Sequence, residues 1–364
     1  MKIHTVMWHD SGGRIGWPFW EDLQAMSEFM ALMGHDVVIY DRDKLARDLH
    51  GESEVARGLP NLFDAETSSV DSAGLRLSYD CDVLFVMATP PVRFGGKVTH
   101  WDEDVCDLMH NTRGKVCIFV NEALAFNSLK NDANEKWGRN RFDVPFIFCP
   151  TSTTNSTDRL CPFLKGLCNG EATTVNQTWA IGYKWIQEKG YDFRPYTPPK
   201  ADFFYGGVVR PHEFRKTFDA LSREFESGCW YSYGEIAKHY GFPDMVKERY
   251  GKLIVDREKL VEITSECRFS FLPYDRTKDY VTTKALENGV SNSLVLADPG
   301  YNSEGLKFET VDLQDIDAIK RYMSMSEDNR LELVEKQHKM LEDFDFYGKM
   351  ESEFKTMEQK IKSR

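Results

Sequence analysis

The sequence predicts an α/β protein with two domains, each built on a parallel sheet flanked by helices. The chain has 364 residues, more than one hydrophobic core usually serves. Short β-rich apolar runs alternate with helix-length amphipathic segments, which is typical of parallel α/β layers. The alternation restarts after the proline-rich stretch 194–199, which interrupts helix and strand hydrogen bonding alike. We therefore expect two Rossmann-like domains, residues 1–195 and 196–345.

The first domain is expected to combine several strands with an early helix. Residues Trp20–Met33 keep an apolar face and are followed by Gly34, which suits a left-handed helix stop. Strands are expected at Lys2–Trp8, Asp36–Tyr40, Asp82–Ala88, Lys115–Val120 and Val144–Phe148.

The second domain repeats this pattern. A final helical segment, about Phe346–Lys362 within 346–364, could pack back on either domain, the N-terminal one included. Strands are expected at Ala201–Tyr205, Gly228–Ser232, Arg268–Leu272 and Ser293–Ala297, and helices near Pro211–Glu226, Arg257–Ser265 and Thr282–Val290.

Composition narrows the class of protein. With 41% hydrophobic and 29% charged residues, the chain can bury sizeable cores, which excludes wholesale disorder. It has neither an apolar run of about 18 residues nor a signal-peptide pattern at its start, so we expect a soluble cytoplasmic protein without membrane contact. The formal net charge of −12 lowers the expectation of tight nonspecific binding to polyanions. The eight cysteines form no CxxC pair and are expected to be reduced and mostly buried.

A candidate anion site follows the first strand of the second domain. Ligands of doubly wound sheets collect at the carboxyl ends of strands, and Ala201–Tyr205 runs into Gly206-Gly207-Val-Val-Arg210. The glycines allow close backbone approach, while Arg210 and a helix start near Pro211 attract an anion such as a diphosphate. An ordinary turn is the alternative, because neither a Walker A nor a GxGxxG pattern is present.

A second candidate lies on the helix expected near Thr282. Lys284 and Glu287 are three residues apart and share one face of that helix. The lysine suits a phosphate, and the glutamate can accept hydrogen bonds from a ribose diol. The alternative is an ordinary surface ion pair.

Taken together, these segments resemble the phage DNA β-glucosyltransferase family, whose members glucosylate hydroxymethylcytosine in T-even phage DNA. The resemblance extends over roughly residues 2 to 300. It is carried by Ser27-Glu-Phe-Met-Ala-Leu-Met-Gly34, Phe94-Gly-Gly-Lys97, Ala180-Ile-Gly-Tyr183-Lys184, Phe204-Tyr-Gly-Gly207-Val-Val-Arg210 and Lys284-Ala-Leu-Glu287-Asn-Gly together with its continuation to Asp298.

The resemblance implies a GT-B fold with a deep interdomain cleft, the acceptor on the N-terminal domain and a UDP-sugar, most simply UDP-glucose, on the C-terminal domain. It places Arg210 on the diphosphate, Lys284 beside it, Glu287 on the ribose and Asp275 on the sugar side. Physically, fixed cations and a helix start would stabilise the departing diphosphate.

Two departures from the family pattern affect this site. Where the family has a second phosphate arginine, this chain has Phe214, and Arg215 one position later is the expected substitute. Lys284 stands where the family has another arginine, which keeps the charge but loses the bidentate fork.

The resemblance also implies a general base in the loop after the fourth strand. An ungapped alignment puts Asn121 there, and an amide cannot take a proton, whereas Glu122 is the next residue. A carboxylate at a strand end can deprotonate an acceptor hydroxyl. The competing base is His9 or Asp10, before the glycine-rich stretch 11–16.

The acceptor groove is expected on locally basic segments. Lys136, Arg139 and Arg141 lie in a basic stretch that contains Trp137, and Arg93 and Lys97 could extend the same edge. Such cations would contact DNA phosphates while an extruded base enters the pocket. A solvated loop is the alternative.

Metal ligands are not assigned. The pairs Asp80/Asp82 and Asp41/Asp43 spell an acidic motif that binds a metal in another glycosyltransferase architecture. The first pair precedes a strand, the wrong end for this sheet type, and the second could cap a helix. Mg²⁺ or Mn²⁺ could still assist the leaving diphosphate.

The function implied is transfer of a sugar, most simply glucose, from a UDP-sugar to a hydroxymethyl-pyrimidine in double-stranded DNA by direct displacement. The enzyme would act as a monomer in the cytoplasm of a phage-infected bacterium. Other sugars such as arabinose, a non-DNA acceptor, and an inactive nucleotide-sugar or DNA-binding module stay open as alternatives.

Overall fold

The computed structural model divides the chain into two compact units. Unit 1 comprises Met1–Ile181 and Tyr347–Arg364, and unit 2 comprises Gly182–Phe346. The structure describes residues 1–8, 17–40, 80–88, 93–94, 97–98, 112–120, 146–149, 172–188, 196, 198–206, 221, 228–231, 257–274, 281–301 and 303–363.

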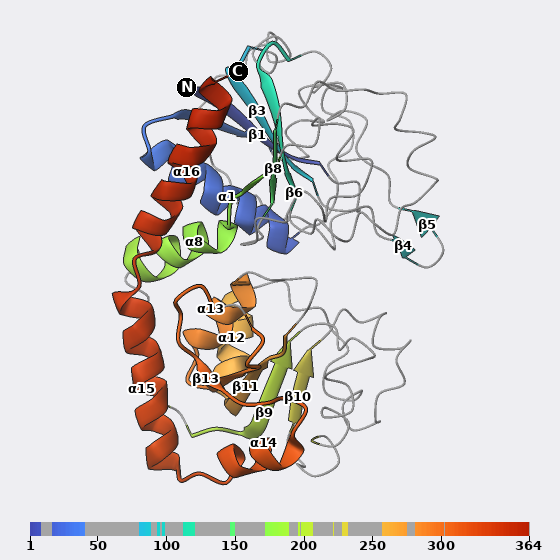
Figure 1. The fold of residues 1–364 in the computed structure, drawn as a ribbon. Helices are drawn as coiled ribbons and strands as arrows, with labels where there is room; N and C mark the ends of the chain where they lie inside the picture. The colour runs from blue at the N-terminus through green and yellow to red at the C-terminus, as the bar shows by residue number, and fades with distance from the viewer. Residues whose placement is uncertain are drawn as a thin grey trace. The chain divides into compact units, whose positions relative to one another are not determined.

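Unit 1 is built on a six-stranded parallel sheet (Figure 1). The strand order is β2-β1-β3-β6-β7-β8. Val83 to Val86 of β3 are all buried, as expected for a central strand covered on both faces. The strands are β1 (Lys2–Trp8), β2 (Asp36–Tyr40), β3 (Val83–Ala88), β6 (Lys115–Val120), β7 (Phe146–Cys149) and β8 (Ala172–Thr174). Every strand predicted in this half is confirmed, and β8 adds to them.

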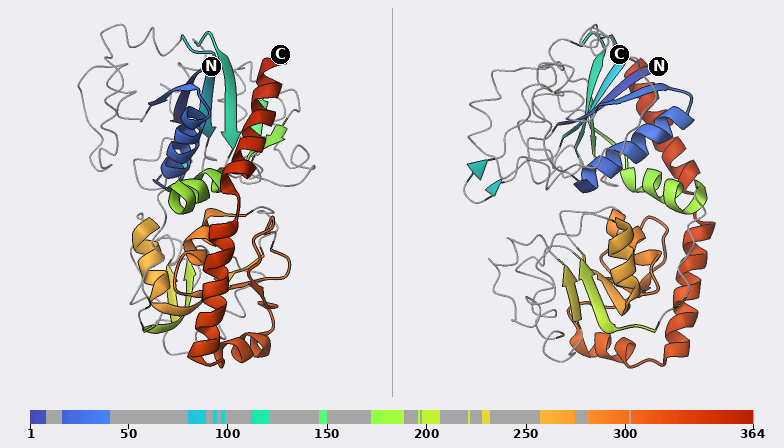
Figure 2. Two further views of the ribbon diagram at one scale, coloured as in Figure 1. Left: turned by 90° about the vertical axis from the view of Figure 1, so that its left-hand side faces the viewer. Right: turned by 180° about the vertical axis from the view of Figure 1, so that it is seen from behind.

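Two helices from opposite ends of the sequence pack together in unit 1. Helix α1 (Trp17–Leu32) starts three residues before its predicted position and is followed by Gly34 with φ +86°. In helix α16 (Phe346–Lys362), the ring of Phe354 lies 5.6 Å from that of Phe29 in α1. The right-hand view of Figure 2 shows the two helices beside each other. The buried face of α16 repeats every three to four residues, at Phe346, Met350, Phe354, Met357 and Ile361.

Glu353 of α16 fixes the helix to the segment after β8. Its carboxylate accepts hydrogen bonds from the Asn176 backbone N–H at 2.6 Å and from the Trp179 indole N–H at 3.1 Å. Trp179 belongs to α8 (Gln177–Gly182), which continues into the π-helical segment η2 (Tyr183–Glu188), and its side chain is fully buried. Further along α16, Glu358 pairs with His35.

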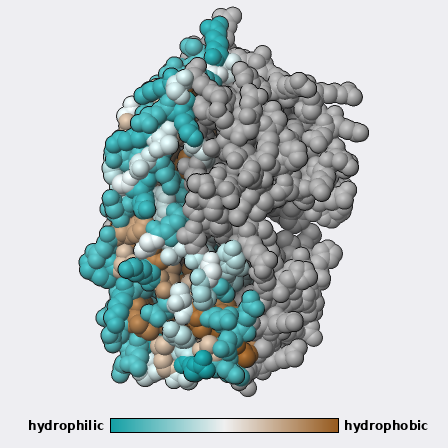
Figure 3. All heavy atoms as spheres, viewed as in Figure 1, coloured by the Kyte–Doolittle hydropathy of each residue, from teal (hydrophilic) through white to brown (hydrophobic). Residues whose placement is uncertain are grey.

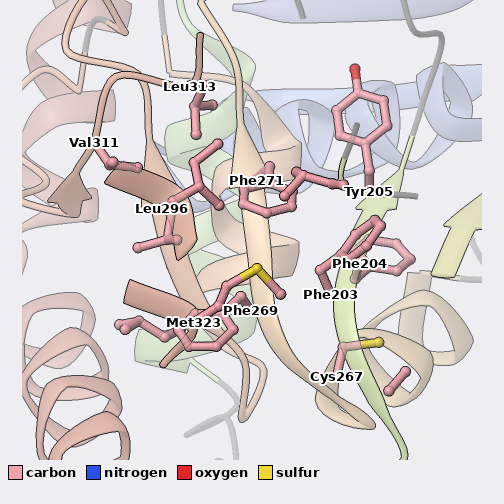
Figure 4. Packing of buried hydrophobic residues seen from close by; sticks show 14 of the residues in the cluster. Phe203, Phe204, Tyr205, Cys267, Phe269, Phe271, Leu296, Val311, Leu313 and Met323 are labelled. Atoms are coloured by element: carbon pink, nitrogen blue, oxygen red, sulfur yellow. The ribbon is translucent and has the colours of Figure 1, made fainter. Parts of the chain in front are cut away.

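Unit 2 contains a five-stranded parallel sheet in the order β10-β9-β11-β12-β13. Its core is rich in aromatic residues, with the rings of Phe203 and Phe271 centred 5.7 Å apart (Figure 4). The strands are β9 (Ala201–Gly206), β10 (Gly228–Tyr231), β11 (Cys267–Leu272), β12 (Leu294–Ala297) and β13 (Glu309–Thr310). The strands predicted for this half are confirmed, while β13 was not predicted.

Four described helices accompany this sheet: α12 (Arg257–Ser265), α13 (Thr283–Gly289), α14 (Ile316–Met323) and α15 (Glu327–Asp343). The predictions of α12 and α13 are confirmed, whereas α14 and α15 were not predicted. The helix predicted at Pro211–Glu226 lies outside the described residues except for Leu221, which is helical and buried. Hydrophilic residues predominate along the left-hand edge of Figure 3, where α15 and α16 lie.

The cysteines that the structure describes with side chains are Cys81, Cys117 and Cys267, and all are free and buried. Burial raises the pKa of the Cys117 thiol to about 12, which makes it a poor nucleophile. Among the described residues no helix is long and apolar enough to cross a lipid bilayer.

Candidate functional site

Three parallel strands of unit 2 end at one edge of the sheet. Leu272 at the end of β11 pairs with Ala297 at the end of β12. Phe204 of β9 pairs with Ser270 of β11. Each strand ends two residues later, at Gly206 and Leu272, so the two ends lie level with each other. Because ligands of doubly wound sheets collect at the carboxyl ends of strands, this edge is the candidate site.

The loop after β12 covers the start of α13 at the same edge. The Thr282 N–H, just before α13, donates to the Tyr301 hydroxyl at 3.1 Å, and the Thr282 hydroxyl lies 3.2 Å from it. The Tyr301 N–H donates to the Asp298 carbonyl at 2.8 Å, which closes a turn after the strand. The first residues of α13 are therefore held against the sheet edge by backbone and hydroxyl contacts.

Lys284 reaches from the first turn of α13 to the end of β9. Its ammonium nitrogen lies 4.8 Å from the centre of the Tyr205 ring, and Tyr205 directly precedes Gly206. At this distance the electron-rich face of the ring attracts the cation. A positive charge is thus held beside the end of β9, where an anion would be stabilised.

Glu287 lies one turn after Lys284 on the same helix. The residue is only 8% exposed, which is unusual for an acid because a buried carboxylate needs compensating partners. A buried acid at a sheet edge is suited to accept hydrogen bonds with fixed geometry. This arrangement could bind the hydroxyl groups of a sugar ring.

Helix α15 braces the connection between α13 and β12. Gln337 donates to the carbonyls of Gly289 and Ser293 at 2.9 and 3.2 Å, and its side-chain oxygen accepts from the Val295 N–H at 3.0 Å. His338 donates to the Ser291 carbonyl at 2.8 Å. These side chains fix the end of α13, and with it the positions of Lys284 and Glu287 relative to the sheet.

A buried arginine extends this brace. Arg330, which is almost fully buried, donates to the Asn292 carbonyl at 2.7 Å and forms a bidentate pair with Glu327 at 3.0 and 2.6 Å. The Arg330 hydrogen bond holds the pKa of the Glu327 carboxyl below its ordinary value. Glu327 also accepts a hydrogen bond from Tyr196 at 3.2 Å, which links α15 to the proline-rich stretch.

The structure places only some of the predicted site residues. Gly206 lies at the end of β9, and Lys284 and Glu287 lie on α13, so these three belong to one edge of one sheet. The other predicted nucleotide residues lie outside the described part of the chain: Gly207, Arg210, Arg215 and Asp275. The same holds for the candidate catalytic residues: His9, Asp10, Asn121 and Glu122.

Two of the predicted DNA contacts lie in a small hairpin. Arg93 belongs to β4 (Arg93–Phe94) and Lys97 to β5 (Lys97–Val98), which pair in antiparallel fashion with Phe94 opposite Lys97. The two basic residues are therefore close in backbone position. The remaining predicted contacts lie outside the described residues: Lys136, Arg139 and Arg141.

Sequence reasoning missed Tyr205 and Tyr301. Tyr205 reads as one more apolar strand residue, and only its position directly before the two glycines distinguishes it. Tyr301 follows a Pro-Gly turn and carries no signal of its own. No group of three or more potential metal-ligating side chains occurs within the part of the chain that the structure describes.

No protein-family model matches the chain, and no curated protein sequence matches it. Among solved structures, a point mutant of T4 phage BGT in complex with UDP-glucose has a TM-score of 0.64 at 13% identity, over 99% of each chain. T4 phage BGT in complex with UDP and Mn²⁺ has a TM-score of 0.61 at 14% identity, again over 99% of each chain. The chain therefore has the GT-B fold with two Rossmann-like α/β domains, while the cleft expected between them stays a prediction.

Proposed function

We propose that this protein is a UDP-sugar-dependent glycosyltransferase that modifies hydroxymethylated pyrimidines in double-stranded DNA. The observation that carries the proposal is the likeness, over 99% of both chains, to T4 phage BGT in complex with UDP-glucose. It is supported by the basic and acidic side chains of Lys284 and Glu287 at the strand edge of unit 2.

In this proposal the nucleotide binds at the carboxyl edge of the unit 2 sheet. Gly206 and Gly207 allow the diphosphate to approach the backbone, and Lys284 neutralises part of its charge. Glu287 accepts hydrogen bonds from the ribose hydroxyls. Departure of UDP is eased because the cations stabilise the negative charge that develops on it.

Three further residues complete the proposed donor site. Arg210 is assigned to the diphosphate, and Arg215 replaces the arginine missing at position 214. Asp275 is assigned to the sugar hydroxyl groups. The sugar hydroxyls would donate hydrogen bonds to this carboxylate, which gives selectivity among sugars, and glucose is the proposed donor sugar.

The proposed reaction is a single displacement with inversion. The hydroxymethyl oxygen of the base attacks the anomeric carbon of the sugar, and the bond from that carbon to the diphosphate breaks as the new bond forms. Glu122 accepts the hydroxyl proton, and Asn121 orients the hydroxyl group. Asp10 is the alternative base.

Mg²⁺ or Mn²⁺ is proposed only as a stimulating ion. Among the described residues no group of three or more potential metal-ligating side chains occurs. A bound ion would add to the cations that stabilise the leaving diphosphate.

The acceptor is proposed to bind through basic side chains of unit 1. Arg93, Lys97, Lys136, Arg139 and Arg141 contact phosphates, while the modified base is extruded from the duplex. Because the protein carries a net charge of −12, its DNA affinity is expected to be modest and to fall steeply with salt.

Mass spectrometry of nucleosides tests donor and acceptor together. DNA containing hydroxymethylcytosine, hydroxymethyluracil or unmodified cytosine is incubated with the protein and one of several UDP-sugars. We expect a hexosyl adduct on a hydroxymethylated nucleoside with UDP-glucose and no adduct on unmodified cytosine. A pentosyl adduct would show that the donor sugar is a pentose and not glucose. Transfer of sugar to a small molecule but not to DNA would refute the proposed DNA acceptor.

A further inference from the structure

We propose that Tyr205 is a positioning residue for the donor nucleotide: its ring holds the Lys284 ammonium at the end of β9, where the diphosphate binds. This inference rests on the proposed function, because it assigns a role within the same nucleotide site. The new element is the contact between Lys284 of α13 and Tyr205 of β9, because the family resemblance assigns no role to Tyr205.

The ring of Tyr205 is itself held rigidly. Tyr205 is 4% exposed and pairs with Trp230 of β10, so its backbone is fixed within the sheet. Figure 4 shows its ring at the margin of the aromatic core, with the hydroxyl directed away from Phe203 and Phe204. The face of the ring is therefore presented at a defined position beside the strand end.

The backbone of Lys284 is fixed independently of the ring. The Tyr301 hydroxyl holds the N–H of Thr282 before α13, and Gln337 holds the carbonyl of Gly289 at its end. Both ends of α13 are thus anchored, so the position of the ammonium group depends on the contacts that the long lysine side chain makes. Ordering such a side chain costs conformational entropy when a ligand binds.

The cation–π contact reduces this cost. With its nitrogen 4.8 Å from the ring centre, Lys284 lies within the range in which an aromatic face attracts an ammonium group. An ammonium is a point charge without the planar fork of arginine, so its placement depends on neighbouring groups. A diphosphate then meets a cation that is already near its binding position, which favours affinity through preorganisation.

A double-mutant cycle on UDP affinity tests the inference. The variants are Tyr205→Leu, Tyr205→Phe, Lys284→Met and the double variant Tyr205→Leu/Lys284→Met, measured by calorimetry on the full chain. Because such contacts range from weak to strong with desolvation, we expect Tyr205→Leu to weaken UDP binding by about 3- to 30-fold. Tyr205→Phe keeps the ring and should restore most of the affinity. In the Lys284→Met background, Tyr205→Leu should change affinity by less than about twofold.

The affinity for uridine, which lacks phosphate, distinguishes a role of Tyr205 in positioning Lys284 from general damage to the nucleotide site. Uridine binding, followed by ligand NMR, should be the same for Tyr205→Leu as for the unaltered protein, because only the diphosphate meets Lys284. An equal loss for uridine and UDP, or an effect of Tyr205→Leu that persists without Lys284, would overturn the inference.

The same measurements separate failure of this inference from failure of the proposed function. UDP binding that is unaffected by Tyr205→Leu or by Lys284→Met would overturn the inference alone. Absence of UDP binding to the unaltered, folded protein would refute the proposed function, and the inference with it.

Discussion

Replacement of Gln337 by methionine is expected to destabilise unit 2 far more than its modest change in shape implies. The Gln337 side chain is 5% exposed and makes three buried hydrogen bonds to the segment between α13 and β12. Methionine has a similar volume, so little cavity forms. The main cost is the loss of partners for the Val295 N–H and for the carbonyls of Gly289 and Ser293.

The magnitude follows from the cost of buried groups without partners. Each such group costs about 1–3 kcal/mol, and an N–H is harder to satisfy elsewhere than a carbonyl. Taking the two carbonyls at the low end of that range gives a total of about 3–5 kcal/mol. Because α13 carries Lys284 and Glu287, UDP binding should weaken as well.

Guanidinium unfolding followed by circular dichroism and tryptophan fluorescence measures this change. The two units can unfold separately, so the transition that moves in the variant is fitted by itself. The matched control is Lys336→Met, one residue away on α15, because the hydrogen-bonded partner of Lys336 is Glu332, in an exposed pair at 2.7 Å. Such pairs contribute about 0–1 kcal/mol. A loss for Gln337→Met no larger than that of the control would refute the proposed brace.

The remaining predictions concern the helix anchor, a histidine and the catalytic base. Glu353→Ala should destabilise unit 1 by about 3–6 kcal/mol, since two charge-assisted hydrogen bonds of about 1.5–3 kcal/mol each are lost. Chemical unfolding measures the change, and Glu351→Ala, which removes a partly exposed pair with Lys355, is the control. Burial lowers the pKa of His338 from its ordinary 6.5, so its stabilising neutral form is present above that value and its contribution is lost as the pH falls through the folded pKa. Unfolding free energies should therefore fall more steeply on acidification in the unaltered protein than in His338→Gln, and equal slopes would contradict this. Glu122→Gln should lower the transfer rate by about two to four orders of magnitude with UDP affinity retained, as checked by turnover assays and calorimetry. Retained turnover in Glu122→Gln together with inactivity of Asp10→Asn would move the base to the first loop.

The strands were predictable from sequence where apolar residues gather in short runs. The β6 bounds agree with prediction because Lys115–Val120 is a nearly continuous apolar run, as expected of a central parallel strand. The β1 bounds agree too, although Lys2, His4 and Thr5 interrupt its apolar residues. Helix α15 was missed for the opposite reason. Its buried face contains Arg330 and Gln337 beside Val334 and Leu341, so half of that face is polar and the amphipathic pattern is weak.

The candidate site was predictable only in part, again for a physical reason. Lys284 and Glu287 are neighbours on one helix, so their shared face follows from spacing alone. The contact of Lys284 with Tyr205 depends on how α13 packs over the end of β9, which no local pattern encodes. The same holds for Tyr301, whose role arises from the path of the loop after β12.

The return of α16 to unit 1 has a consequence for synthesis on the ribosome. Unit 1 is discontinuous in the chain, because α16 follows the whole of unit 2. Until α16 emerges, the nascent unit 1 lacks Phe354, which packs on Phe29, and Glu353, which accepts the hydrogen bond of the Trp179 indole N–H. We therefore expect unit 2 to complete its fold first during translation, with the nascent N-terminal sheet exposing an apolar surface suited to chaperones.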